Sequence, residues 1–161
     1  MKVTDFAPRT GAIEAYLTRS HLFGVEVGAD VGAHAESLLT HCDIKLLTLV
    51  DPWPNPICEG YCEGRLARWK NKFKMCKGVS KDAIRAFEDN SLDFVYLDQE
   101  HDYKSVNEDL TLWWPKLTTG GIMALRNYGA KNEGLKRAAD EFIVGMNFRI
   151  EASCAELIIF K

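Results

Sequence analysis

Residues 22–32, Leu-Phe-Gly-Val-Glu-Val-Gly-Ala-Asp-Val-Gly, decide how this chain folds. The stretch starts apolar, carries one acid and ends in a glycine-containing turn. The next residues place apolar side chains on one helical face, at Val31, Ala35, Leu38, Leu39 and Cys42. A strand that turns through glycines into a helix can present backbone N–H groups to a ligand. Gly28 and Gly32 would let the backbone approach it closely, although similar turns also occur where nothing binds.

The length and charge of the chain restrict its class. Its 161 residues suit one domain, residues 1–161, because domains typically hold roughly 100–200 residues. The net charge of -3 argues against nucleic acid or an anionic membrane as partner. The basic stretch 65–77 keeps nucleic acid open as a minor alternative, and it could instead attract an acidic acceptor. Residues 1–16 resemble no secretory signal, and no apolar run could span a bilayer. We therefore expect a cytoplasmic protein.

The five cysteines leave two interpretations open. Cys42 and Cys154 lie beside apolar residues and are expected to be buried. Cys58, Cys62 and Cys76 could bind zinc, but the spacing lacks a second close Cys or His pair. Reduced thiols in a cytoplasmic protein are the simpler account.

Strand-like and helix-like segments alternate along the rest of the chain. Strands are expected at about 23–27, 45–50, 74–77, 92–97 and 122–125, and helices at 10–18, 31–42, 80–87, 102–117 and 132–142. Residues 53–64 are rich in Pro, Gly and Cys and are expected to form an ordered loop. Residues 148–150 and 156–160 are expected to form an antiparallel pair. This order predicts an α/β fold with a mostly parallel sheet, whose ligands bind at the carboxyl ends of the strands.

An acid follows the second expected strand. Asp51 comes 23 positions after Gly28, where a carboxylate can accept hydrogen bonds from ribose hydroxyls. It could also be a turn residue before Pro52. A nicotinamide dinucleotide enzyme would prefer G-x-G-x-x-G, but Asp30 stands at the middle glycine and the chain leaves no room for a substrate domain.

Three motifs in order resemble those of class I S-adenosylmethionine-dependent methyltransferases. They are Val-Glu-Val-Gly-Ala-Asp-Val-Gly at 25–32, Leu-Val-Asp-Pro-Trp at 49–53, and the run 90–128. The last contains acid-x-x-His-x-Tyr at 98–103 and Gly-Gly before the fifth strand, as in small O-methyltransferases. The resemblance implies a single-domain Rossmann-like methyltransferase fold. Its sheet would be mostly parallel and seven-stranded, with an antiparallel C-terminal strand and helices on both faces.

The resemblance also implies roles for individual residues. Asp98 would lie beside the sulfonium and the acceptor, and His101 would be the general base that removes the acceptor's proton. His101 could instead be a solvent-facing residue near a helix cap. The residues implied for binding S-adenosylmethionine are Glu26, Gly28, Ala29, Asp30, Gly32, Asp51, Trp53, Val79, Ser80 and Asp98.

The chain departs from the family pattern at three positions. Asp30 stands where a glycine is frequent, and Val79 where an acid often contacts the adenine amine. Metal-dependent relatives carry an Asp after the fifth strand, where this chain has Arg126 and Asn127. Magnesium is therefore a doubtful second cofactor, and no metal ligand is assigned.

The resulting expectation is an enzyme, a methyltransferase that methylates a hydroxyl of a small molecule such as a sugar or natural product. The alternative is a non-catalytic nucleoside-binding or scaffold protein on the same fold. A small-molecule substrate is the expected partner, and exposed tryptophans would favour a homodimer. At least one of Trp113 and Trp114 is expected to lie in the core or at an interface.

Overall fold

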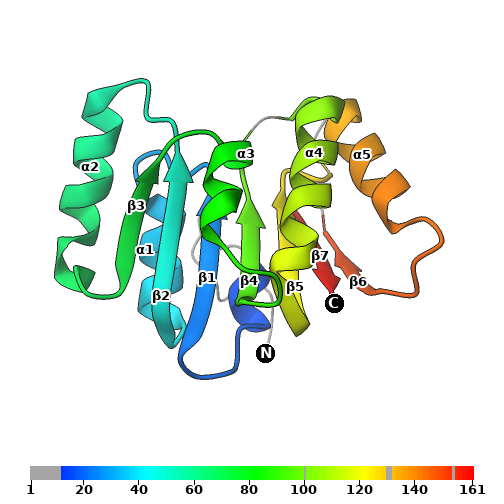
Figure 1. The fold of residues 1–161 in the computed structure, drawn as a ribbon, viewed down its shortest axis with the longest axis horizontal. Coiled ribbons are helices and arrows are strands. Elements are labelled where there is room, and N and C mark those ends of the chain that lie inside the picture. The colour runs from blue at the N-terminus through cyan, green and yellow to red at the C-terminus, as the bar shows by residue number, and fades with distance from the viewer. Residues whose placement is uncertain (1–11, 100, 130–131, 154) are drawn as a thin grey trace.

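A seven-stranded sheet forms the centre of the protein (Figure 1). The computed structural model describes residues 12–99, 101–129, 132–153 and 155–161. The strands are β1 (Leu22–Val27), β2 (Ile44–Asp51), β3 (Phe73–Lys77), β4 (Leu92–Leu97), β5 (Leu117–Arg126), β6 (Arg149–Ala152) and β7 (Glu156–Phe160). Their order is β3-β2-β1-β4-β5-β7-β6. The first five strands are parallel, and β7 runs antiparallel to β5 and β6. The predicted mostly parallel sheet with an antiparallel C-terminal strand is confirmed.

Helices cover both faces of the sheet, as predicted. They are α1 (Ala33–His41), α2 (Pro56–Leu66), α3 (Ser80–Ala83), α4 (Tyr103–Trp113) and α5 (Glu133–Ile143), with short 3-10 helices at Ala12–Ala15, Ala67–Trp69, Ile84–Ala86 and Trp114–Lys116. The 3-10 helix Ala12–Ala15, α1 and α2 pack on one core, and α3, α4 and α5 pack on the other. Figure 1 shows α3 and α4 in front of the sheet and α1 behind it.

The prediction of an ordered loop at 53–64 is wrong, because α2 occupies most of it. The Asn55 side chain accepts a hydrogen bond from the Ile57 N–H at 3.0 Å, and Pro56 occupies the first turn, where its missing N–H costs nothing. Cys62 and Leu66 are fully buried in the core that α2 shares with α1, beside Gly32. Capping and burial of one helix face outweigh the weak helix propensity of the two glycines.

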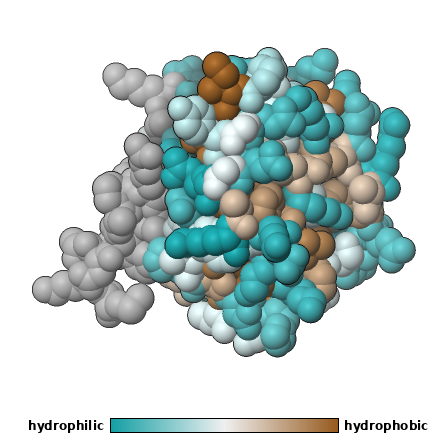
Figure 2. All heavy atoms as spheres, turned by 90° about the vertical axis from the view of Figure 1, so that its left-hand side faces the viewer, coloured by the Kyte–Doolittle hydropathy of each residue, from teal (hydrophilic) through white to brown (hydrophobic). Residues whose placement is uncertain are grey.

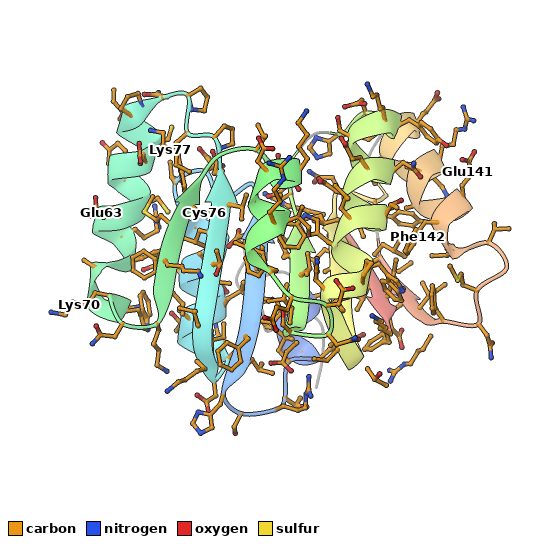
Figure 3. All side chains as sticks on the ribbon, in the orientation of Figure 1. Glu63, Lys70, Cys76, Lys77, Glu141 and Phe142 are labelled. Atoms are coloured by element: carbon orange, nitrogen blue, oxygen red, sulfur yellow. The ribbon has the colours of Figure 1, made fainter. Side chains whose placement is uncertain are left out.

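The face over α2 and β3 is mostly hydrophilic (Figure 2). The basic stretch at 65–77 lies here, and several of its charges are paired. Figure 3 shows Lys77 beside α2, where its Nζ lies 2.5 Å from a carboxylate oxygen of Glu59. Arg65 lies 2.9 Å from Glu36. These pairs neutralise part of the basic charge of the stretch within the protein. No helix in the described part of the chain is long and apolar enough to cross a membrane.

Candidate active site

The turn after β1 brings backbone segments into close contact. Gly28 has a φ of 90°, and its N–H donates to the Val50 carbonyl at 2.8 Å. A Cβ on Gly28 would lie 2.3 Å from the Asp98 carbonyl oxygen, and one on Gly32 would lie 2.9 Å from Cys62 Sγ. Both glycines therefore permit close approaches within the chain itself. Ala29 is buried between them.

Asp51 ties the ends of β1 and β2 together. Its Oδ2 accepts from the Asp30 N–H at 2.9 Å and its Oδ1 from the Trp53 N–H at 2.7 Å. Trp53 Nε1 in turn donates to the Asp30 carbonyl at 2.8 Å, and the indole is buried. The structure thus places Trp53 in the core. Asp51 keeps lone pairs for further donors, since a carboxylate can accept about four hydrogen bonds.

Val79 and Ser80, after β3, face different surroundings. Val79 is exposed at the carboxyl edge of the sheet, whereas Ser80 is buried. Ser80 Oγ donates to Asp109 of α4 and accepts from Trp113 Nε1 at 2.7 Å. Burial raises the pKa of Asp109 to about 6. Sequence reasoning missed Asp109, although its i, i+4 spacing to Trp113 places both on one side of α4.

Asp98 and Arg126 join the ends of β4 and β5. The Asp98 N–H donates to the Val27 carbonyl at 2.8 Å, which fixes this residue beside β1. Arg126 Nη1 lies 2.6 Å from Asp98 Oδ2. Burial raises the pKa of the Asp98 carboxyl, although the guanidinium opposes this shift.

His101 lies at the same edge, next to Asn127. Asn127 adopts a φ of 63° just after β5, and its Nδ2 lies 3.0 Å from His101 Nε2. In the tautomer that carries the ring proton on Nδ1, Nε2 can accept a hydrogen bond from this amide. A small cavity opens beside the pair, lined in part by Asp98, Gln99, His101, Asp109 and Arg126.

Behind this edge, Glu26 belongs to a buried network that sequence reasoning found only in part. His34 Nδ1 lies 3.3 Å from Glu26 Oε1, and the imidazole stacks on Tyr96 with ring centroids 3.8 Å apart. The Tyr96 hydroxyl donates to Glu156 at 2.8 Å. The position of His34 in the sequence could have indicated this network, because an ionisable residue next to Ala35 lies beside the buried face of α1.

Comparison with known proteins places this geometry in a family. A family model described as a methyltransferase domain matches residues 25–128, which is more than half of the chain. The chain belongs to this methyltransferase family. It is a class I S-adenosylmethionine-dependent methyltransferase, as its three motifs predicted. A comparison with curated protein sequences finds no match.

Solved structures show the same fold as the methyltransferase. A Corynebacterium glutamicum protein superposes with a TM-score of 0.76 at 15% identity, covering 92% of this chain and 77% of its own. The precorrin-6y C5,15-methyltransferase of Geobacter metallireducens has a TM-score of 0.75 at 12% identity, covering 92% and 86%. The O-methyltransferase TomG of Streptomyces achromogenes, solved with S-adenosylmethionine, has a TM-score of 0.66 at 13% identity, covering 91% and 74%. These likenesses confirm the Rossmann-like fold.

The methyltransferase offers groups that fit its cofactor and few that fit a metal ion. Asp51 has free lone pairs at the end of β2, Val79 offers an exposed apolar face after β3, and Glu26 Oε2 is buried with no hydrogen-bond partner in the described residues. By contrast, the Asp98 carboxylate is already paired with the Arg126 guanidinium. No group of three His, Cys, Asp or Glu side chains in the described ranges could hold a metal ion. Within the part of the chain that the structure describes, the side chains around Asp98 therefore offer no set of oxygen ligands for a divalent cation.

Proposed function

We propose that this methyltransferase transfers the methyl group of S-adenosylmethionine to a hydroxyl oxygen of a small molecule, such as a sugar or natural product. The observation that carries the proposal is the pair formed by His101 and Asn127 next to Asp98. It places an imidazole nitrogen, 3.0 Å from the Asn127 amide, at the carboxyl edge of the sheet, which is where ligands of parallel α/β sheets bind.

Residues at four strand ends support cofactor binding in this proposal. Asp51 would accept hydrogen bonds from the ribose hydroxyls, and Val79 would pack against the adenine. Glu26 and Asp98 would place negative charge near the cationic part of the cofactor. The backbone from Gly28 to Gly32 would line the rest of the cofactor site. Trp53 and Ser80 would contribute from the core, by holding the turns after β2 and β3 in place.

When bound, the cofactor supplies an electrophilic methyl group on a sulfonium, ready for direct displacement. The chain's contribution is to align the acceptor oxygen and to remove its proton. The acceptor hydroxyl would replace the Asn127 amide as the donor to His101 Nε2. As the oxygen gains its methyl group, its proton ends on Nε2.

We propose that the reaction needs no divalent metal ion. Arg126 holds Asp98 at 2.6 Å, so a metal ion placed there would meet a positive charge. The guanidinium is half exposed and can also attract an anionic group of the acceptor. The site thus favours hydroxylated acceptors that carry a carboxylate or phosphate.

The two tryptophans give no argument for a homodimer. Trp113 is fully buried, and Trp114 packs against Phe142 and Phe148 of its own chain. The free thiols of Cys58 and Cys62 support a reducing compartment such as the cytoplasm.

Calorimetry tests the cofactor part of the proposal. We expect the wild type to bind S-adenosylmethionine and S-adenosylhomocysteine but not NAD, and Asp51→Asn to bind both sulfur ligands more weakly. Acceptor screens with and without EDTA then test the reaction. Binding without methyl transfer to any hydroxylated acceptor, and with His101→Gln behaving as wild type, would favour the non-catalytic alternative.

A further inference from the structure

Five ionisable side chains from five different elements meet in the core behind the cofactor edge. We call them the buried acid cluster: Glu14, Glu26, His34, Tyr96 and Glu156. Glu26 is 1% exposed, and His34 lies between Glu26 at 3.3 Å and Glu14 at 3.8 Å. Glu156 accepts from the Tyr96 hydroxyl and from the Ile13 N–H. The cluster therefore connects α1, β1, β4, β7 and the 3-10 helix Ala12–Ala15.

The charges of the buried acid cluster do not balance. Glu14, Glu26 and Glu156 are three carboxyls, and His34 is the one basic group among the five. Glu14 Oε2, Glu26 Oε2 and His34 Nε2 are buried with no hydrogen-bond partner in the described residues. Fully ionised, the cluster would bury an excess of negative charge, which is costly in a medium of low dielectric constant. Extra protons relieve this excess.

We propose that the buried acid cluster is a proton-exchange site coupled to cofactor binding, in which His34 positions Glu26 and stabilises its charge. The cluster holds an extra proton when the cofactor is absent and releases it when the cationic cofactor binds. This inference rests on the proposed binding of S-adenosylmethionine at the ends of β1 and β4.

The coupling passes through charges at the carboxyl edge. The charge of Asp98 interacts electrostatically with Glu26 and His34, and the charge of Arg126 interacts with Glu26. A positive charge that arrives beside Asp98 therefore acts on Glu26 and His34 as well. Burial raises the pKa of the Glu14 and Glu26 carboxyls. Burial lowers the pKa of His34, but the neighbouring carboxylates together outweigh this effect, so the pKa of His34 is raised. A cation nearby lowers these pKa values, so protons leave. Affinity should therefore rise with pH up to the pKa values of the free protein and be constant above them.

Proton release by the wild type is the first test. Calorimetric titrations in pairs of buffers that differ in ionisation enthalpy, each used near its own pKa, count the protons released on binding between pH 5.5 and 8. We expect release with S-adenosylmethionine, and less release with S-adenosylhomocysteine, which lacks the sulfonium charge. Binding of both ligands with no proton release overturns the coupling and leaves the proposed function intact. If neither ligand binds at any pH, both the proton coupling and the proposed function are overturned.

Two isosteric variants test the role of His34. In His34→Gln, Glu26 loses its positive neighbour, so the pH profile of the dissociation constant should move to higher pH. A shift of one unit corresponds to roughly tenfold weaker binding within that range. Glu14→Gln removes negative charge and should move the profile to lower pH.

His21→Gln is the matched control for these variants, because His21 is an exposed histidine whose neighbour, at 3.9 Å, is Asp43 and not a member of the cluster. It should leave the profile unchanged. A merely structural cluster would weaken binding in both isosteric variants without moving the profile. That result would overturn the inference.

Discussion

Gly28→Ala gives the sharpest test of what the glycine turn after β1 does. Gly28 has a φ of 90°, where a side chain is strained, and a Cβ would lie 2.3 Å from the Asp98 carbonyl oxygen. The left-handed conformation costs about 1–2 kcal/mol, and forcing atoms into a packed site adds about 1–3 kcal/mol. We therefore expect a loss of roughly 2–5 kcal/mol of unfolding free energy, and a melting temperature lower by about 5–15 °C.

Two other glycines separate strain from steric clash. Gly120 has a φ of 78° but open space around its Cβ direction, so Gly120→Ala should show the strain alone, about 1–2 kcal/mol. Gly60 lies in α2 with no neighbour within 4 Å, so Gly60→Ala should stabilise by roughly 0.5–1 kcal/mol. Thermal and urea unfolding of the three variants provide the assay. If Gly28→Ala unfolds like Gly120→Ala, or keeps wild-type stability and loses only cofactor binding, the reasoning is refuted.

Three further predictions concern ionisable groups. Asp109 has a folded pKa of about 6, raised by burial from 3.8, so its ionisation opposes folding. The free energy of unfolding should therefore fall as the pH rises from about 4 to above 6, by up to about 3 kcal/mol. Asp109→Asn should flatten the pH dependence of the melting temperature. A variant whose melting temperature changes with pH as that of the wild type does would contradict this. His101→Gln should lower kcat by about 10²–10⁴-fold, while the exposed-site control His21→Gln should not; equal rates would remove His101 as the base. Arg126→Gln should raise KM for an anionic acceptor more than for a neutral one. EDTA should leave the activity of the wild type unchanged, and inhibition by EDTA would argue for a metal ion.

The sequence predicted the sheet well because each strand carries its own signal. β1 and β4 are mainly apolar runs that end in a glycine turn or an acid. Strands of a parallel sheet are buried on both faces, so such a run is readily predicted as a strand. The helix α2 was missed because its signal is tertiary. Its composition is that of a loop, and what makes it helical is the Asn55 cap together with the burial of Cys62 and Leu66.

The sequence predicted where the candidate site residues lie in the fold but not which side chains they contact, and their roles stay predictions. Asp51, Asp98 and His101 follow strands, so topology alone brings them to one edge. Nothing in the order of residues shows that His34 lies between Glu26 and Glu14, since these groups come from different elements. Such contacts depend on how α1 and the 3-10 helix Ala12–Ala15 pack on the sheet, which no local pattern specifies.

Two of the departures from the family pattern, at Asp30 and Arg126, are accommodated by contacts within the site. Asp30 adopts a φ of 45°, a conformation that aspartate tolerates better than most residues, and its backbone still joins Asp51 to Trp53. Arg126 places a fixed positive charge against Asp98, where a metal-dependent relative would place a cation. A fixed guanidinium cannot lower the pKa of a bound hydroxyl by direct coordination, so removal of the acceptor's proton falls to a base. We propose that His101, which lies 3.0 Å from Asn127, is this base, so that the reaction depends on His101 and on no metal ion.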